Sequence, residues 1–182
     1  MPVDFANPAL RTEGSPYYFD NWNNQATLLI KDKGNVKIEK VNINLYANKF
    51  EAVYDENNVF TFDSNNLIRI KINDKIFRTF EIDADLRILE LLFDGKLSVY
   101  RDYSVTYAEG SPNPMLSRKT NKYIKKPKYY VYDDGTLKEM KMNKKSVSKL
   151  LQSENISSEE ILDYMKQNKL SLGDESDLTQ LF

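Results

Sequence analysis

Apolar and polar residues alternate along much of the chain between residues 25 and 142. Ile68, Ile70 and Ile72, for example, are separated by Arg69 and Lys71. Successive side chains of a β-strand point to opposite faces, so this alternation predicts strands with one buried face. Asn, Asp and Gly residues interrupt it at short intervals, as turns between strands do. We therefore predict a mainly β fold, an antiparallel sandwich or barrel of about 8–11 short strands.

Three dipeptides mark the clearest predicted hairpins: Asn73-Asp74, Asp94-Gly95 and Asp134-Gly135. Asn, Asp and Gly tolerate the positive φ of tight hairpin turns, and apolar strands flank each pair. Between the last two hairpins lies a segment with three prolines, residues 109–128, which we predict to be a long loop.

The periodicity changes near the C-terminus. Asn143 can cap a helix, and Ser157 with Glu160 fits a capping box at the start of another. Both would be short amphipathic helices, followed by a third. We therefore predict an extended N-terminal arm over residues 1–24, an antiparallel β domain over 25–142, and a helical segment over 143–182 packed on that domain.

The chain contains no histidine and no cysteine. Their absence excludes Ser-His and Cys-His catalytic groups, thiolate nucleophiles and metal sites built from these side chains. We predict no catalytic residues, no metal and no cofactor, and hence a protein that is not an enzyme. A hydrolase based on carboxylates stays a weaker alternative, since the chain has 27 acidic residues.

One basic and aromatic segment, residues 118–130, contains no acidic residue. Lysine and tyrosine side chains in such a mixture can contact anionic partners. A net charge of −1 and a preference for lysine over arginine argue against nucleic acid. The candidate binding surface comprises Trp22, Arg118, Lys119, Lys122, Tyr123, Lys125, Lys126 and Lys128.

Several motifs resemble a family of uncharacterised proteins from Bacteroidetes, chiefly flavobacteria. Residues 14–22, GSPYYFDNW, resemble the family's GSPYLFDNW opening, and residues 41–52 resemble its central strand pair. Residues 141–146, 164–171 and 177–178 resemble its C-terminal end. The resemblance implies export to the periplasm or cell envelope, but no activity. Because the sequence opens without a signal peptide, a cytoplasmic location stays open.

These observations favour a non-enzymatic cell-envelope or interaction protein with a protein partner. The alternative is a β-barrel that binds a small apolar ligand in a cavity lined by Tyr and Phe. A closed barrel with an apolar cavity would favour the ligand-binding hypothesis, and a filled core with an exposed apolar patch would favour the protein-partner hypothesis. The sequence contains no apolar run of about 18 residues, so it predicts no transmembrane segment.

Overall fold

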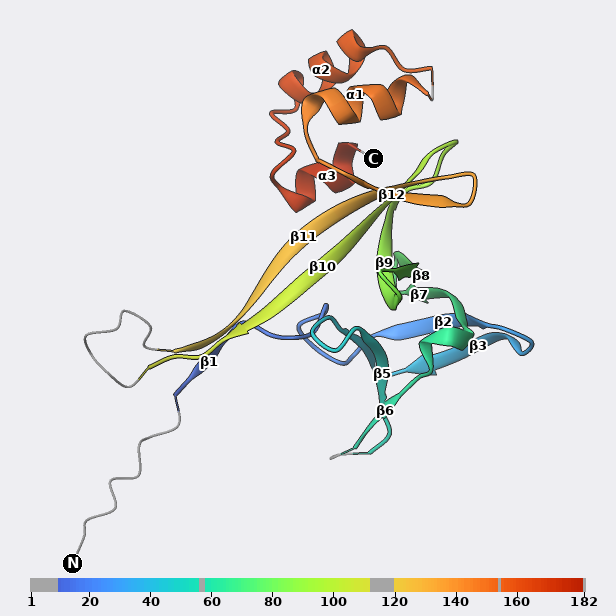
Figure 1. Cartoon of the computed structure of the whole chain (residues 1–182), viewed down its shortest axis with the longest axis vertical. Helices are drawn as coiled ribbons and strands as arrows, with labels where there is room; N and C mark the ends of the chain where they lie inside the picture. Colours follow the sequence, from blue (N-terminus) through green and yellow to red (C-terminus); the bar gives the residue numbers. More distant parts are fainter. Residues whose placement is uncertain (1–9, 56–57, 112–119, 154, 182) are drawn as a thin grey trace, which may run out of the picture.

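The computed structural model describes residues 10–55, 58–111, 120–153 and 155–181. This part of the chain forms twelve β-strands and three short α-helices (Figure 1). The strands of the first half are β1 (Thr12–Glu13), β2 (Gln25–Ile30), β3 (Gly34–Glu39), β4 (Val41–Asn44), β5 (Lys49–Val53), β6 (Val59–Thr61) and β7 (Leu67–Ile72). The others are β8 (Lys75–Ile82), β9 (Asp85–Phe93), β10 (Ser98–Ala108), β11 (Asn121–Asp133) and β12 (Thr136–Met140).

Two sheets of unequal size make up the β structure. The larger has the order β1-β11-β10-β9-β8-β7-β2-β3, with β12 also paired to β11, and the smaller has the order β4-β5-β6. Apart from the short parallel pair of β1 with β11, the strand pairs are antiparallel. Both sheets are open, so the mainly β prediction is confirmed in its sandwich form.

The main hydrophobic core lies where the inner faces of the two sheets meet. On β4, Val41 and Ile43 are fully buried, and on β5 so is Phe50. Leu28 and Ile70 contribute from β2 and β7 to the same cluster. The apolar positions of the alternating pattern thus lie on the buried faces of the strands. Burial of these side chains provides the main driving force for folding.

The N-terminal arm extends the smaller sheet beyond β4. The Tyr18 amide donates to the Ile43 carbonyl at 2.8 Å, and the Leu45 amide donates to the Pro16 carbonyl at 2.8 Å. Gly14 makes the approach to the larger sheet possible, because a Cβ atom there would lie 2.8 Å from the Tyr123 carbonyl oxygen. The arm therefore connects the two sheets.

Strands β10 and β11 form a long two-stranded ribbon that projects from the rest of the sheet (Figure 1). Pairing of β10 with β9 ends at Arg101, whereas pairing with β11 continues to Ala108 opposite Lys122. The predicted loop over 109–128 is therefore wrong for residues 121–128, which belong to β11. Within the described residues, Pro127 lies where β11 has no partner strand on its second side, between the pairings with β1 and β12, and proline is tolerated at such an edge.

The C-terminal helices follow the predicted caps. They are α1 (Lys144–Gln152), capped by Asn143, α2 (Ser158–Gln167), which has the Ser157–Glu160 capping box, and α3 (Glu175–Leu181). Val147, Leu150 and Ile161 of these helices cover Val99 at the start of β10. Within the described residues, no helix has the length and apolar character to cross a bilayer.

The β8–β9 hairpin carries a conformational cost. Its two turn residues, Asp83 and Ala84, have φ values of 53° and 66°. A two-residue turn with both φ values positive favours glycine at the second position, because alanine is strained in the left-handed region.

We expect Ala84→Gly to raise the free energy of unfolding by about 0.5–1 kcal/mol, because glycine relieves this strain. Urea denaturation followed by circular dichroism measures the change. The control is Ala47→Gly, at an exposed turn residue with negative φ, which should not stabilise the protein. Equal effects of the two substitutions would contradict the assignment of strain.

Candidate functional site

Strand alternation divides the predicted binding surface between the two faces of the ribbon. Lys125 lies opposite Val105 and Tyr123 opposite Tyr107, on the face that also carries Tyr103. The other face carries the exposed side chains of Lys122, Lys126 and Lys128. Arg118 and Lys119 lie outside the described residues. The predicted surface is therefore two surfaces, one facing the N-terminal arm and one facing away from it.

Trp22 belongs to the arm-facing side. Its ring contacts Tyr17 edge-on, with centroids 4.9 Å apart. The Lys125 ammonium donates to the Tyr17 carbonyl at 2.5 Å, so Trp22 and Lys125 contact the same arm residue. The ring of Tyr123 contacts Tyr107, at 4.9 Å between centroids. The structure thus gathers Trp22, Tyr123 and Lys125 around the arm.

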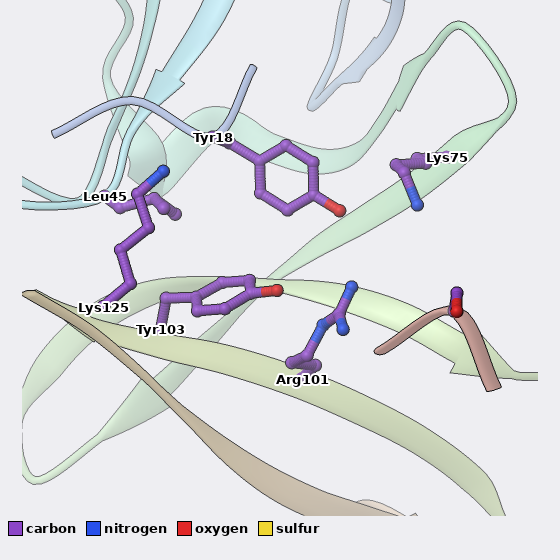
Figure 2. A pocket seen from close by; sticks show the side chains of 7 residues that line it. Tyr18, Leu45, Lys75, Arg101, Tyr103 and Lys125 are labelled. Atoms are coloured by element: carbon purple, nitrogen blue, oxygen red, sulfur yellow. The ribbon is translucent and has the colours of Figure 1, made fainter. Parts of the chain in front are cut away.

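A pocket of about 390 Å³ lies between the arm and the inner part of the same ribbon face. Figure 2 shows the side chains of Tyr18, Tyr103, Arg101 and Lys75 pointing into a common space, with Lys125 at the other end. The lining is polar and basic, with aromatic side chains between the basic groups. Its residues are Tyr18, Leu45, Lys75, Arg101, Tyr103, Lys125 and Ser176.

Asn42 holds the arm over this pocket. Its side-chain oxygen accepts from the Phe19 amide at 3.0 Å and the Ile43 amide at 2.9 Å. Its amide group donates to the carbonyls of Phe19 at 2.9 Å and Asn21 at 3.1 Å. Asn42 is 1% exposed, so these groups have no water to replace a lost partner. One side chain therefore fixes the arm residues next to Tyr18.

A buried carboxylate organises the basic side chains at the inner end of the pocket. Glu90 accepts from Lys75 Nζ at 2.9 Å and from Arg101 Nε and Nη2 at 2.9 and 2.6 Å. The side chains of Glu90 and Arg101 are each 3% exposed. A buried charge requires such a partner, because the protein interior solvates it poorly. The network sets the orientation of Lys75 and Arg101.

This environment changes the acidity of two lining groups. Burial, reinforced by the nearby Glu90 carboxylate, raises the pKa of Tyr18 well above its usual value, so the hydroxyl stays protonated. Burial alone would lower the pKa of Arg101, but Glu90, together with Tyr103 and Tyr18, offsets this, and the net effect raises it. At neutral pH the Arg101 guanidinium therefore stays charged and paired with Glu90, and the Tyr18 phenol stays neutral.

Of the seven lining residues the sequence prediction named only Lys125 and missed the other six, among them Tyr18, Lys75, Arg101 and Tyr103. A signal for one of them was present. Glu90 and Arg101 each interrupt an apolar strand on either side of the predicted Asp94-Gly95 hairpin. The structure pairs these two positions through a register shift at Val99 and Tyr100, whereas a two-residue Asp94-Gly95 turn would place Glu90 opposite Val99. The opposite charges alone were therefore the available signal for a cross-strand ion pair.

Acidic residues gather nowhere in a metal-binding arrangement within the part of the chain that the structure describes. Asp83 occupies a hairpin turn with positive φ. Aspartate tolerates this backbone conformation, so the turn explains its presence there without a metal ion.

No family model, no curated protein and no solved structure matches this chain.

We expect Asn42→Ala to lower the free energy of unfolding by about 2–4 kcal/mol, because it takes a partner from the buried Ile43 amide and from the partly buried backbone groups of Phe19. Chemical denaturation measures the loss, and faster hydrogen exchange at the Phe19 amide reports release of the arm. Asn21→Ala is the control, since its exposed side chain accepts one local bond from Asn23. If the Phe19 amide kept its protection, Asn42 would not hold the arm.

Stability should fall at alkaline pH partly through Tyr18. Unfolded tyrosine loses its proton near pH 10, whereas buried Tyr18 keeps it, so the folded state binds more protons above that pH. The contribution of Tyr18 is intact below pH 10 and is lost as the pH rises further. The Tyr18→Phe variant lacks this contribution. Its free energy of unfolding should therefore fall less steeply above pH 10 than that of the wild type, by about 1.4 kcal/mol per pH unit.

Urea denaturation at a series of pH values tests this dependence. Tyr54→Phe is the control, since that ring is 83% exposed. Identical slopes for the wild type and Tyr18→Phe would show that Tyr18 is not buried as described.

Proposed function

We propose that this protein is a non-enzymatic binding protein that takes a small anionic ligand into the pocket beneath its N-terminal arm. The observation behind the proposal is that Lys75, Arg101 and Lys125 line one concave site. A pocket of about 390 Å³ falls within the range of small-molecule sites, and basic side chains attract carboxylates and phosphates.

The tyrosines of the pocket add hydrogen-bonding capacity. The Tyr18 and Tyr103 rings contact each other edge-on, with centroids 5.9 Å apart. Their hydroxyl groups point into the same space as Arg101 and Lys75 (Figure 2). A ligand with an acidic group and neighbouring hydroxyl or carbonyl groups would satisfy both kinds of side chain.

Two arguments support binding without catalysis. Glu90 is occupied by Lys75 and Arg101, and the raised pKa of Tyr18 keeps its hydroxyl protonated at neutral pH, so it cannot act as a general base. Hydrolysis by a carboxylate pair needs one acid and one base placed across the substrate. Glu90, which Lys75 and Arg101 contact, is already held in ion pairs.

The apolar-ligand alternative has less support than an anionic ligand. It requires a closed barrel around an apolar cavity, whereas both sheets are open and the space beneath the arm is basic. We further propose a periplasmic or cell-envelope location, which rests on the resemblance of residues 14–22 and 41–52 to the flavobacterial family.

Isothermal titration calorimetry with citrate, inorganic phosphate and ribose 5-phosphate, at constant ionic strength, tests the proposal. These probes separate carboxylates from phosphates and small anions from larger ones. We expect binding of at least one of them, weakened about tenfold by Lys125→Gln, because a charge-assisted hydrogen bond is lost. Lys125→Arg keeps the charge and should keep the affinity.

Lys126→Gln is the matched control. Lys126 is the next residue along β11, and its side chain lies on the opposite face of the ribbon. Equal losses from Lys125→Gln and Lys126→Gln would show unspecific attraction, and failure of all three probes would remove the support for a small anionic ligand.

A further inference from the structure

The two sheets have open edges that differ in how well they are protected. Exposed edge strands invite pairing with another chain, and charged residues or proline on the edge prevent it. The open stretch of β11 carries Lys126, Pro127 and Lys128. Charged residues also occur on the edge strands β1, β3 and β12: Glu13, Lys37, Glu39, Lys138 and Glu139.

Strand β6 lacks this protection. Residues 58–62 read Asn-Val-Phe-Thr-Phe and contain no charge and no proline. On one side β6 pairs with β5, and no further strand follows it in the order of the smaller sheet. All three residues of β6 are exposed. Among the edges described, β6 is thus the apolar, uncharged one.

The hydrophobic core reaches the surface at this edge. Phe50 is fully buried, and its ring contacts Phe62 with centroids 5.0 Å apart. Phe62 in turn contacts Phe60 at 4.8 Å, and Phe60 is 55% exposed. Tyr54, on the neighbouring strand end, is 83% exposed. A row of aromatic rings therefore leads from the core to an open edge.

We propose that β6 is a dimerisation edge, at which β6 of one copy pairs antiparallel with β6 of a second copy across a two-fold axis. A pairing centred on Phe60 places that residue opposite its own copy and joins two three-stranded sheets into one of six strands. Phe60 and Tyr54 of both copies then extend the two cores into one. This interface is independent of the pocket beneath the arm.

Self-complementarity makes a second copy the occupant that fits. Every residue of a two-fold interface meets the same surface on its partner, so a charged strand would face its own charge. Residues 58–62 carry none, and the chain's net charge of −1 causes little repulsion between copies. An aromatic pair across the strands adds to the backbone hydrogen bonds of the new ladder.

Sedimentation velocity of the full chain from about 1 to about 500 μM tests the interface, because dimerisation depends on concentration. We expect a dimer for the wild type and a monomer for Phe60→Lys, with Tyr54→Lys weakening the dimer at least tenfold. Leu162→Lys is the control, since this α2 side chain is 39% exposed and lies on a helix. Thermal melts confirm that each variant is folded, as expected for exposed positions.

A wild-type monomer at every concentration would overturn the proposal, as would a dimer that survives Phe60→Lys. Equal dissociation by Leu162→Lys would also overturn it, because the effect would not be specific to the β6 edge. Each of these results leaves anion binding by the pocket untouched, and loss of anion binding leaves the dimer untouched.

Discussion

The buried ion pair of Glu90 with Arg101 is the interaction on which the arrangement of this molecule depends. It joins β9 to β10 at the last residue that pairs the two strands, where the ribbon leaves the sheet. Two charges that are each 3% exposed are stable only together, and removing one partner of such a pair costs about 3–5 kcal/mol. This pair therefore lies both where the ribbon leaves the sheet and beside the space beneath the arm, which Arg101 lines.

Most of the fold could be predicted from local patterns. Alternation identified the buried face of β4, the Asp134-Gly135 turn identified the β11–β12 hairpin, and the Ser157–Glu160 pair identified the start of α2. These features depend on residues close together in the sequence. The beginning of β11 was missed because Pro127 suggests a loop, whereas the long-range pairing with β10 tolerates proline on an open edge.

The candidate site was harder to predict because its parts come from distant segments. Arm residues near 18, the start of β8 and the middle of β10 and β11 meet only through sheet topology. The basic segment drew attention to Lys125 correctly, but composition could not separate it from Lys126, which strand alternation places on the opposite face. Asn42, which holds the arm, resembles any polar residue on an exposed strand face until its four bonds are seen.

The most direct test of the account is an NMR titration of the ¹⁵N-labelled full chain with ribose 5-phosphate and with citrate. If the anion binds in the pocket, shift changes concentrate at the amides of Tyr18, Lys75, Arg101, Tyr103 and Lys125, with arm residues shifting together with the ribbon. Changes centred on Lys122, Lys126 and Lys128 would place the anion on the outer face and contradict the pocket as the binding site, as would spectra that neither ligand alters.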